Sequence, residues 1–131
     1  MKVVLDTNIV VSGFLSPLGK PAIILRMILQ GDLDICFDTA ILTEYEQVLC
    51  RSKFAGKIHQ TAIRRFVDII SVLGIMINSN PGNDKMPDEA DRKFFDAART
   101  AGAVLITGNK KHFPDEPYIM TPSEFLAHLD R

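Results

Sequence analysis

Short apolar runs alternate with amphipathic segments along the whole chain. Apolar runs rich in β-branched residues cover residues 2–5, 33–37, 75–77 and 103–107, and a shorter run at 118–120 is a candidate fifth strand. Helical spacing of apolar positions covers residues 21–29, 39–50, 61–73, 88–101 and 122–129. Strands that alternate with helices predict an α/β fold around a mostly parallel sheet of four or five strands flanked by helices.

Glycine, proline and aspartate mark the ends of these segments. Pro21 suits the first turn of a helix, Gly74 and Gly102 terminate helices, and Asp38 and Asp88 stand where helix N-caps are expected. The polar stretch 78–87 is a loop rather than a linker, and no repeat or low-complexity tract interrupts the pattern. We therefore expect a single domain over residues 1–131.

Composition narrows the class of protein without naming a function. The chain has 131 residues, of which 47% are apolar, enough for one substantial core. The net charge of −1 does not point to a nucleic-acid binder, although a local basic patch would suffice for one. Cys36 and Cys50 lack metal-site spacing and are expected to be reduced core residues. With no leader and no apolar run of membrane length, we expect a soluble, cytoplasmic protein without a membrane partner.

The segment KVVLDTNI places a carboxylate directly after a buried strand. A buried, unpaired carboxylate is costly, so Asp6 should lie at a strand end, in a cleft or facing a cation. In open α/β sheets, ligands bind beyond the carboxyl ends of the strands. Thr107, Gly108 and Asn109 occupy the equivalent end of the fourth predicted strand. These two strand ends are the predicted location of a site.

Two further acids interrupt apolar helix faces. Glu44 lies three residues after Ile41, on the inward stripe of the helix predicted over 39–50. Asp91 lies three residues before Phe94 on the helix predicted over 88–101, so it points to the same face as Phe94. Three carboxylates from separate elements thus point inward, and like charges repel unless a cation joins them. Oxygen ligands favour a hard ion, Mg²⁺ or Mn²⁺.

Each acid also has a purely structural interpretation. Asp6 can cap a turn, Glu44 can lie at the edge of its helix face, and Asp88 and Asp91 have the spacing of an N-cap and an N3 residue. For Asp88 the capping interpretation is preferred. The combination of Asp6, Glu44 and Asp91 on this topology favours a site, but periodicity alone leaves both interpretations open.

Three stretches of the sequence together resemble the PIN-domain family. They are VLDTNIVVSGFLS at 4–16, ILTEYEQVL at 41–49 and DEADRKFFDAARTAGAVLITGNKKHFP at 88–114, and they span almost the whole chain. The last resembles the branch of the family described as toxins of toxin–antitoxin systems. The resemblance implies a PIN-like three-layer sandwich and a metal-dependent ribonuclease that cuts single-stranded RNA.

The resemblance also implies roles for individual residues. Asp6, Glu44 and Asp91 would be the catalytic acids and the ligands of Mg²⁺ or Mn²⁺. The supporting or phosphate-contacting residues would be Asn8, Ser12, Thr107 and Asn109. Many relatives carry a fourth acid after the fourth strand, where this chain has Asn109 and His112. This departure favours one weakly held ion, and capping or packing is as good an interpretation of His112 as catalysis.

Partners are expected from charge and from surplus apolar surface. Lys110 and Lys111 follow the fourth strand and are candidates for contact with RNA phosphates. The apolar segments 23–29 and 66–73 are large for one small core and predict either a homodimer or a docking face for an antitoxin protein. The rival functions are a catalytically inactive PIN-like module that binds RNA or protein and, more remotely, a phosphotransfer domain with Asp6 as acceptor.

Overall fold

The computed structural model describes residues 1–130 and contains a five-stranded sheet in which every pair of neighbouring strands is parallel. The strand order is β3-β2-β1-β4-β5. The strands are β1 (Lys2–Leu5), β2 (Asp34–Phe37), β3 (Ile75–Met76), β4 (Val104–Ile106) and β5 (Ile119–Met120). The predicted α/β class and the fifth strand are therefore confirmed. The order reverses at β1, so the carboxyl ends of β1 and β4 are neighbours at the switch point.

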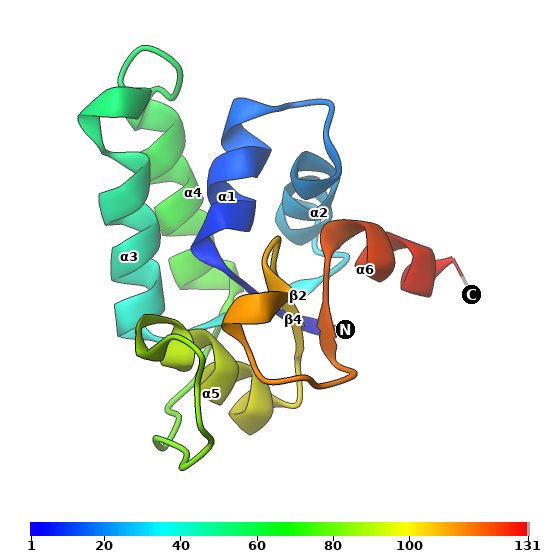
Figure 1. Cartoon of the computed structure of the whole chain (residues 1–131). Coiled ribbons are helices and arrows are strands. Elements are labelled where there is room, and N and C mark those ends of the chain that lie inside the picture. Colours follow the sequence, from blue (N-terminus) through cyan, green and yellow to red (C-terminus); the bar gives the residue numbers. More distant parts are fainter. Residues whose placement is uncertain (131) are drawn as a thin grey trace.

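Helices cover both faces of this sheet. They are α1 (Thr7–Leu15), α2 (Lys20–Leu29), α3 (Thr39–Leu49), α4 (Gln60–Leu73), α5 (Arg92–Ala101) and α6 (Pro122–Leu129), with short 3₁₀ turns η1 (Ser52–Phe54), η2 (Glu89–Asp91) and η3 (Lys110–His112). Helix α5 packs on β1, β2 and β4, and Figure 1 shows the strands between α5 and the pair α1–α2. The result is the three-layer sandwich that the sequence predicts.

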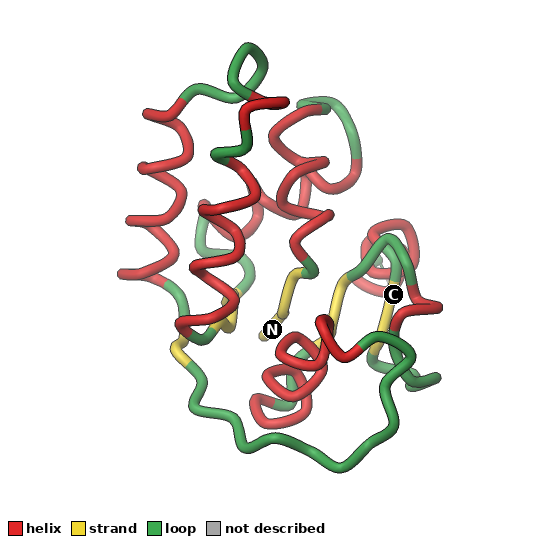
Figure 2. The backbone as a smooth tube through the Cα atoms, turned by 60° about the vertical axis from the view of Figure 1, so that its left-hand side comes forward, coloured by secondary structure: helices red, strands yellow, loops and turns green. Residues whose placement is uncertain are grey.

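Helix α1 is the element that the sequence analysis did not predict. Its segment TNIVVSGFL is short and mostly apolar, and only Asn8 and Ser12 mark its exposed side, so the amphipathic pattern of a surface helix is weak. The structure explains this pattern, because α1 packs against both α2 and α3 and buries Ile9 and Val10. Figure 2 shows α1 leaving the end of its strand at the middle of the molecule.

Helix ends follow the predicted capping residues, with one difference. The Asp38 carboxylate accepts a hydrogen bond from the Ile41 amide at 2.7 Å, and Gly102 ends α5 in the left-handed region at φ 64°. The segment 88–101, predicted as one helix, instead begins with the 3₁₀ turn η2. Asp88 caps Ala90 at 3.0 Å, and the α-helix starts only after Asp91. Asp91 therefore stands at the junction of two helical segments.

The core is continuous through the three layers, and one buried hydrogen bond joins α3 to the end of β1. The Tyr45 hydroxyl, fully buried on α3, donates to the Leu5 carbonyl oxygen at 2.5 Å. Cys36 is buried as expected, but the core assignment of Cys50 is wrong. Cys50 is exposed because it follows the last turn of α3, where the buried helix face has already ended.

Within residues 1–130, no single helix is long and apolar enough to cross a membrane. Helices α1 and α2 have that length and composition only as a pair, and the pair is bent by 100°.

Candidate metal and active site

The first part of the candidate site is the contact between the ends of β1 and β4. The Asp6 amide donates to the Ile106 carbonyl at 3.0 Å, which extends the pairing of the two strands by one residue. The buried Thr107 hydroxyl donates to Oδ2 of Asp6 at 2.8 Å, and the Asn109 amide donates to the Thr107 hydroxyl oxygen at 3.0 Å. Parallel pairing thus brings Asp6, Thr107 and Asn109 together, as the strand-end argument predicts.

Glu44 approaches this strand end from α3. Its carboxylate accepts a hydrogen bond from the Thr7 hydroxyl and forms an ion pair with Lys93 of α5, with Nζ 2.7 Å from Oε1. The Glu44 side chain is 31% exposed, whereas Glu46 is 44% exposed and faces Arg64 on α4. Both glutamates are partly buried, and Glu44 is the one that contacts Thr7 beside the strand end. The sequence does not single out Lys93, because only the packing of α5 beside α3 brings it to Glu44.

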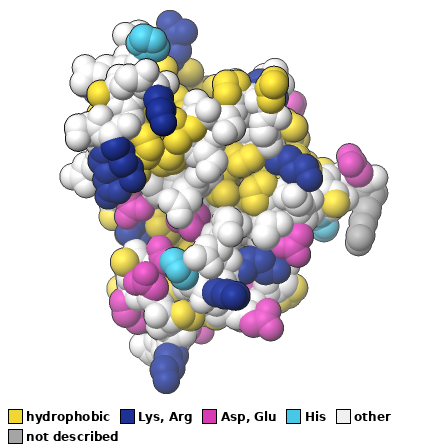
Figure 3. Space-filling view, turned by 45° about the horizontal axis from the view of Figure 1, so that its top comes forward, with side chains coloured by type: hydrophobic (Ala, Val, Ile, Leu, Met, Phe, Trp, Pro, Cys, Tyr) yellow, Lys and Arg dark blue, Asp and Glu magenta, His cyan; other side chains and the backbone are white. Residues whose placement is uncertain are grey.

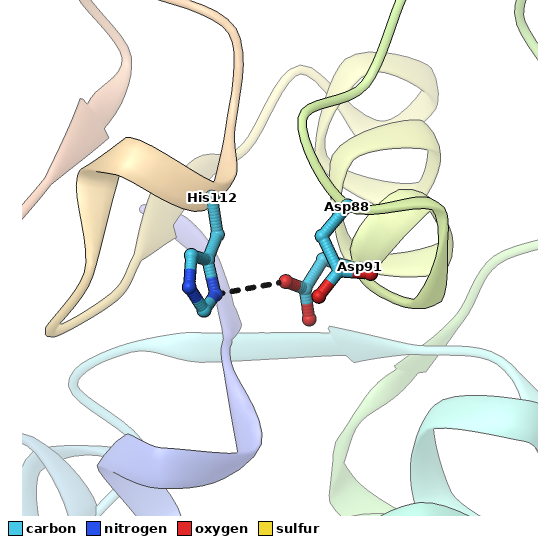
Figure 4. A group of neighbouring side chains, drawn as sticks. All are labelled: Asp88, Asp91 and His112. Atoms are coloured by element: carbon cyan, nitrogen blue, oxygen red, sulfur yellow. Dashed lines mark ion pairs between the residues drawn. The ribbon is translucent and has the colours of Figure 1, made fainter.

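Asp91 lies opposite the turn that follows β4. Its side chain is 17% exposed, and its Oδ2 lies 3.2 Å from Nδ1 of His112 (Figure 4). Despite that distance, this buried oxygen makes no hydrogen bond of acceptable geometry with any described residue. The other ring nitrogen, Nε2, lies 2.9 Å from the side-chain nitrogen of Asn109. An acceptor that is buried and still available is a good ligand for a cation.

The turn that carries Asp88 and Asp91 is fixed to α5 by an ionic network. Arg92 forms an ion pair with Glu89 at 2.6 Å and donates to the Gly82 carbonyl at 2.9 Å. The buried Asp96 carboxylate lies 3.2 Å from Arg99 and accepts from the Gly82 amide at 3.4 Å. A β-carbon at Gly82 would meet the Arg99 guanidinium at 2.2 Å, so only glycine allows this close approach without a shift. The long loop 78–87 is thereby held against the start of α5.

The acids influence each other electrostatically. Burial raises the pKa of Asp6, the hydrogen bond from Thr107 opposes that shift, and the charges of Asp91 and Glu44 raise the pKa further. Burial also raises the pKa of Asp91, with a further increase from Asp88, while His112 and Lys93 act in the opposite direction. Such mutual repulsion between carboxylates is the condition under which a cation is bound.

The acid and histidine side chains that lie closest together are not the set Asp6, Glu44 and Asp91 expected from the sequence. Within residues 1–130, one trio of acid or histidine side chains has its ligand atoms within 4.8 Å of one another, and it is Asp88, Asp91 and His112. Asp88 is the N-cap that the sequence predicts and also a member of this trio. Asp6 and Glu44 are not members of this trio. Asp6 is nevertheless influenced by it, because the charge of Asp91 raises the pKa of Asp6. The carboxylates of Asp88 and Asp91, with the His112 imidazole beside them, fit a divalent cation.

The remaining predicted site residues lie around this centre. Asn8 and Ser12 are exposed on α1, and within residues 1–130 no hydrogen bond or ion pair joins their side chains to the acids. Lys110 lies 3.2 Å from Glu124 of α6, and Lys111 is exposed beside it. Figure 3 shows basic and acidic side chains close together around a histidine on this face of the molecule.

Fold and site together define an α/β protein with clustered acids at the switch point of a parallel sheet. Comparison with known proteins agrees with this class. Residues 2–111 match the sequence profile described as PIN domain. An archaeal relative, "Uncharacterized protein MJ1680" of Methanocaldococcus jannaschii, is 32% identical over 147 aligned positions, which cover all of this chain and 93% of the relative.

A solved structure shares the fold. It is described as the crystal structure of VapBC2 from Rickettsia felis bound to a DNA fragment from their promoter. The match has a TM-score of 0.57 and 16% identity, and it covers 92% of this chain and 97% of the other. The present chain belongs to the PIN-domain family, whose members are generally nucleases.

The raised pKa of Asp6 predicts how the stability of the metal-free protein depends on pH. The pKa is higher in the folded than in the unfolded chain, so this group stabilises the fold below its ordinary pKa of 3.8, and that stabilisation is lost as pH rises through the folded pKa. Asp6→Asn keeps an oxygen for Thr107 and removes the charge. In urea unfolding with EDTA, the variant should be more stable than wild type at pH 7, with the difference vanishing toward pH 3.

Asp32→Asn, an exposed change on the loop before β2, is the matched control and should show no such pH-dependent gain. An Asp6→Asn protein that is less stable than wild type at pH 7 would contradict the assignment of Asp6 as a destabilising buried charge.

Proposed function

We propose that this protein is a metal-dependent endoribonuclease that hydrolyses phosphodiester bonds of single-stranded RNA and acts as the toxin of a toxin–antitoxin pair. The observation that carries the proposal is the set of inward carboxylates, Asp6, Glu44 and Asp91, at the switch-point edge of a PIN-domain sheet. Membership of a family of nucleases supports the reaction class.

The proposed division of labour follows from the contacts of each acid. Asp6 and Asp91 would hold the Mg²⁺ or Mn²⁺ ion, with Thr107 fixing the rotamer of Asp6 through its hydrogen bond. Glu44 would act beside them, its carboxylate oriented by Thr7 and balanced by Lys93. When bound, a divalent ion makes a coordinated water more acidic and stabilises charge on a phosphoryl group. Asn109 would support this end of β4 through its contacts with Thr107 and His112.

The reaction is tested by cleavage of a labelled, unstructured RNA. Wild-type protein should cleave with Mg²⁺ or Mn²⁺ and not with EDTA, and Asp6→Asn should lower the rate at least about a hundredfold, since it removes an electrostatic contribution to transition-state stabilisation. Both proteins are purified identically, and Asp32→Asn serves as an active control. Equal cleavage by wild type and Asp6→Asn would contradict the proposal.

A specific alternative is kept because of the residues that replace the fourth acid. Asn109 and His112 stand in that region, and Lys93 already balances Glu44. If the wild-type protein binds single-stranded RNA but cleaves it neither with Mg²⁺ nor with Mn²⁺, the protein is an inactive binding module instead.

RNA contact is proposed for the two lysines of η3. Lys111 is exposed, and the ion pair of Lys110 with Glu124 has both partners about half exposed, so the pair is weak and Lys110 can exchange it for a phosphate. Both lysines follow the strand end that carries Thr107 and Asn109. A basic rim beside an acidic centre would position the RNA backbone without contacting the metal ligands.

Replacing Lys110 and Lys111 together with alanine should weaken binding of single-stranded RNA and reduce the slope of log affinity against log salt by about 0.7 for each lost phosphate contact. Binding is measured by fluorescence anisotropy with Asp6→Asn as background, to prevent cleavage. Lys2→Ala removes an exposed charge at the amino end of the central strand β1, the end opposite the site, and should leave the slope unchanged. An unchanged slope in the double variant would remove these lysines from the interface.

Two partner surfaces are proposed from apolar exposure. An open groove of about 300 Å³ lies between α1, α2 and α4, with Phe14, Leu25 and Phe66 in its wall and Arg26 and Arg65 at its rim. We propose that this groove receives an antitoxin segment. A separate exposed patch formed by Val72, Leu73 and Met76 at the end of α4 and the edge strand β3 would serve a homodimer. The solved relative of the same fold was crystallised as a VapBC2 assembly.

Sedimentation velocity tests both surfaces. The protein alone should sediment as a dimer at high concentration, and addition of the protein encoded by the neighbouring gene should give a larger complex. Ala62→Trp, which fills the groove, should abolish the larger complex and leave the dimer, whereas Ala40→Trp on the exposed side of α3 should change neither. A monomer at every concentration contradicts the dimer, and full complex formation by Ala62→Trp contradicts the groove.

A further inference from the structure

The cluster of Asp88, Asp91 and His112 contains a donor type that a magnesium site does not need. Its ligand atoms lie within 4.8 Å of one another, and they come from two separate turns, η2 and η3 (Figure 4). Mg²⁺ is bound by oxygen and keeps several waters, whereas imidazole nitrogen suits transition-metal ions. One nitrogen and two carboxylates in the same small space therefore favour a different class of ion.

The atoms that face the cluster are available for ligation. Oδ2 of Asp91 is buried and makes no hydrogen bond of acceptable geometry within residues 1–130, although it lies 3.2 Å from Nδ1 of His112. Asp88 uses Oδ1 to cap the Ala90 amide, which does not occupy its second oxygen. The same helix start can thus supply two carboxylate oxygens without losing its cap.

The ring of His112 is held in a suitable orientation by Asn109. Nε2 lies 2.9 Å from the Asn109 side-chain nitrogen, which leaves Nδ1 facing Asp91. For Nδ1 to bind a metal, Nε2 must carry the hydrogen and donate it. Asn109 accepts such a bond once its amide turns by 180° and presents its oxygen, the arrangement in which metal-bound histidines are commonly held. The backbone amide of Asn109 also donates a hydrogen bond to the Thr107 hydroxyl oxygen, which fixes the position of this residue.

We propose that Asp88, Asp91 and His112 form a mixed carboxylate–imidazole site that selects a divalent transition-metal ion over Mg²⁺, with Asn109 as the positioning residue of the imidazole. The inference deepens the proposed function and rests on it in one respect, because Asp91 belongs to both ligand sets. It assigns His112 to metal binding in the region where relatives are expected to carry a fourth acid, and it gives Asp88 a second role besides capping.

Metal binding is measured on the full chain without RNA, so that its outcome is independent of cleavage. Metal-free protein is titrated with Mn²⁺ and with Mg²⁺ by calorimetry, and the Mn²⁺-loaded protein is examined by electron spin-echo spectroscopy for nitrogen coupling. Wild type should bind Mn²⁺ at least about tenfold more tightly than Mg²⁺ and show the coupling of an imidazole nitrogen. His112→Ala should lose the coupling and at least about tenfold in Mn²⁺ affinity, with Mg²⁺ affinity nearly unchanged.

Two further variants separate ligation from folding. Asp88→Asn keeps an oxygen for the Ala90 cap and should weaken the binding of both ions. His128→Ala removes an exposed histidine on α6 and should match wild type in every measurement. Thermal unfolding of each variant establishes that it is folded before titration.

Two results overturn the proposal. One is equal Mn²⁺-to-Mg²⁺ selectivity in wild type and His112→Ala, and the other is the absence of nitrogen coupling or of Mn²⁺ binding in wild type. A protein that shows His112-dependent selectivity but cleaves no RNA would refute the ribonuclease proposal alone. A protein that cleaves RNA with a metal preference independent of His112 would refute this inference alone.

Discussion

The arrangement of the site depends on the burial of one carboxylate at the end of β1. Asp6 is only 6% exposed, and its immediate support is the hydroxyl of Thr107 from the neighbouring strand. Neutral hydrogen bonds from the Thr107 hydroxyl and the Thr7 backbone offset only part of the cost of burying this charge, since the net effect is still a raised pKa of Asp6. The fold tolerates this cost because β1 is a central strand whose register with β4 is fixed, and because a cation can balance the charge.

Two sets of contacts hold the other acids near that strand end. The Tyr45 hydroxyl ties α3 to the last carbonyl of β1 and so sets the position of Glu44, one residue earlier on the helix. On the other side, the contacts of Arg92 and Asp96 with Gly82 hold the loop that leads into Asp88 and Asp91. The two contacts hold the acids of α3 and of the turn before α5 near the end of β1, and a shift of either would separate them.

The sequence predicts those parts of this arrangement that depend on local periodicity. The strands, five of the six helices and the inward direction of Glu44 follow from apolar spacing, and Asp6 follows from the position of a carboxylate after a buried run. Helix α1 is hard to predict because it is only nine residues long and its polar positions, Asn8 and Ser12, are too few to mark an amphipathic face among β-branched residues. Cys50 was misplaced for a related reason, since periodicity does not show where a buried helix face ends.

Contacts between distant turns are the part that periodicity cannot supply. Asp88 and His112 approach each other only because η2 and η3 face across the strand ends, and the hydrogen bond of His112 to Asn109 depends on the backbone of the turn after β4. The ion pair of Lys93 with Glu44 likewise joins two helices whose packing the sequence does not specify. These contacts between distant turns decide the donor atoms that a metal would meet.

The position of a bound ion shows most directly whether the acids form a metal site. Crystals of the wild-type protein grown with Mn²⁺ are measured at a wavelength where manganese scatters anomalously. We expect an anomalous peak at coordination distance from a carboxylate oxygen of Asp91, beyond the carboxyl ends of β1 and β4. A peak elsewhere on the molecule, or none at Asp91 under conditions where RNA is cleaved, would contradict this assignment.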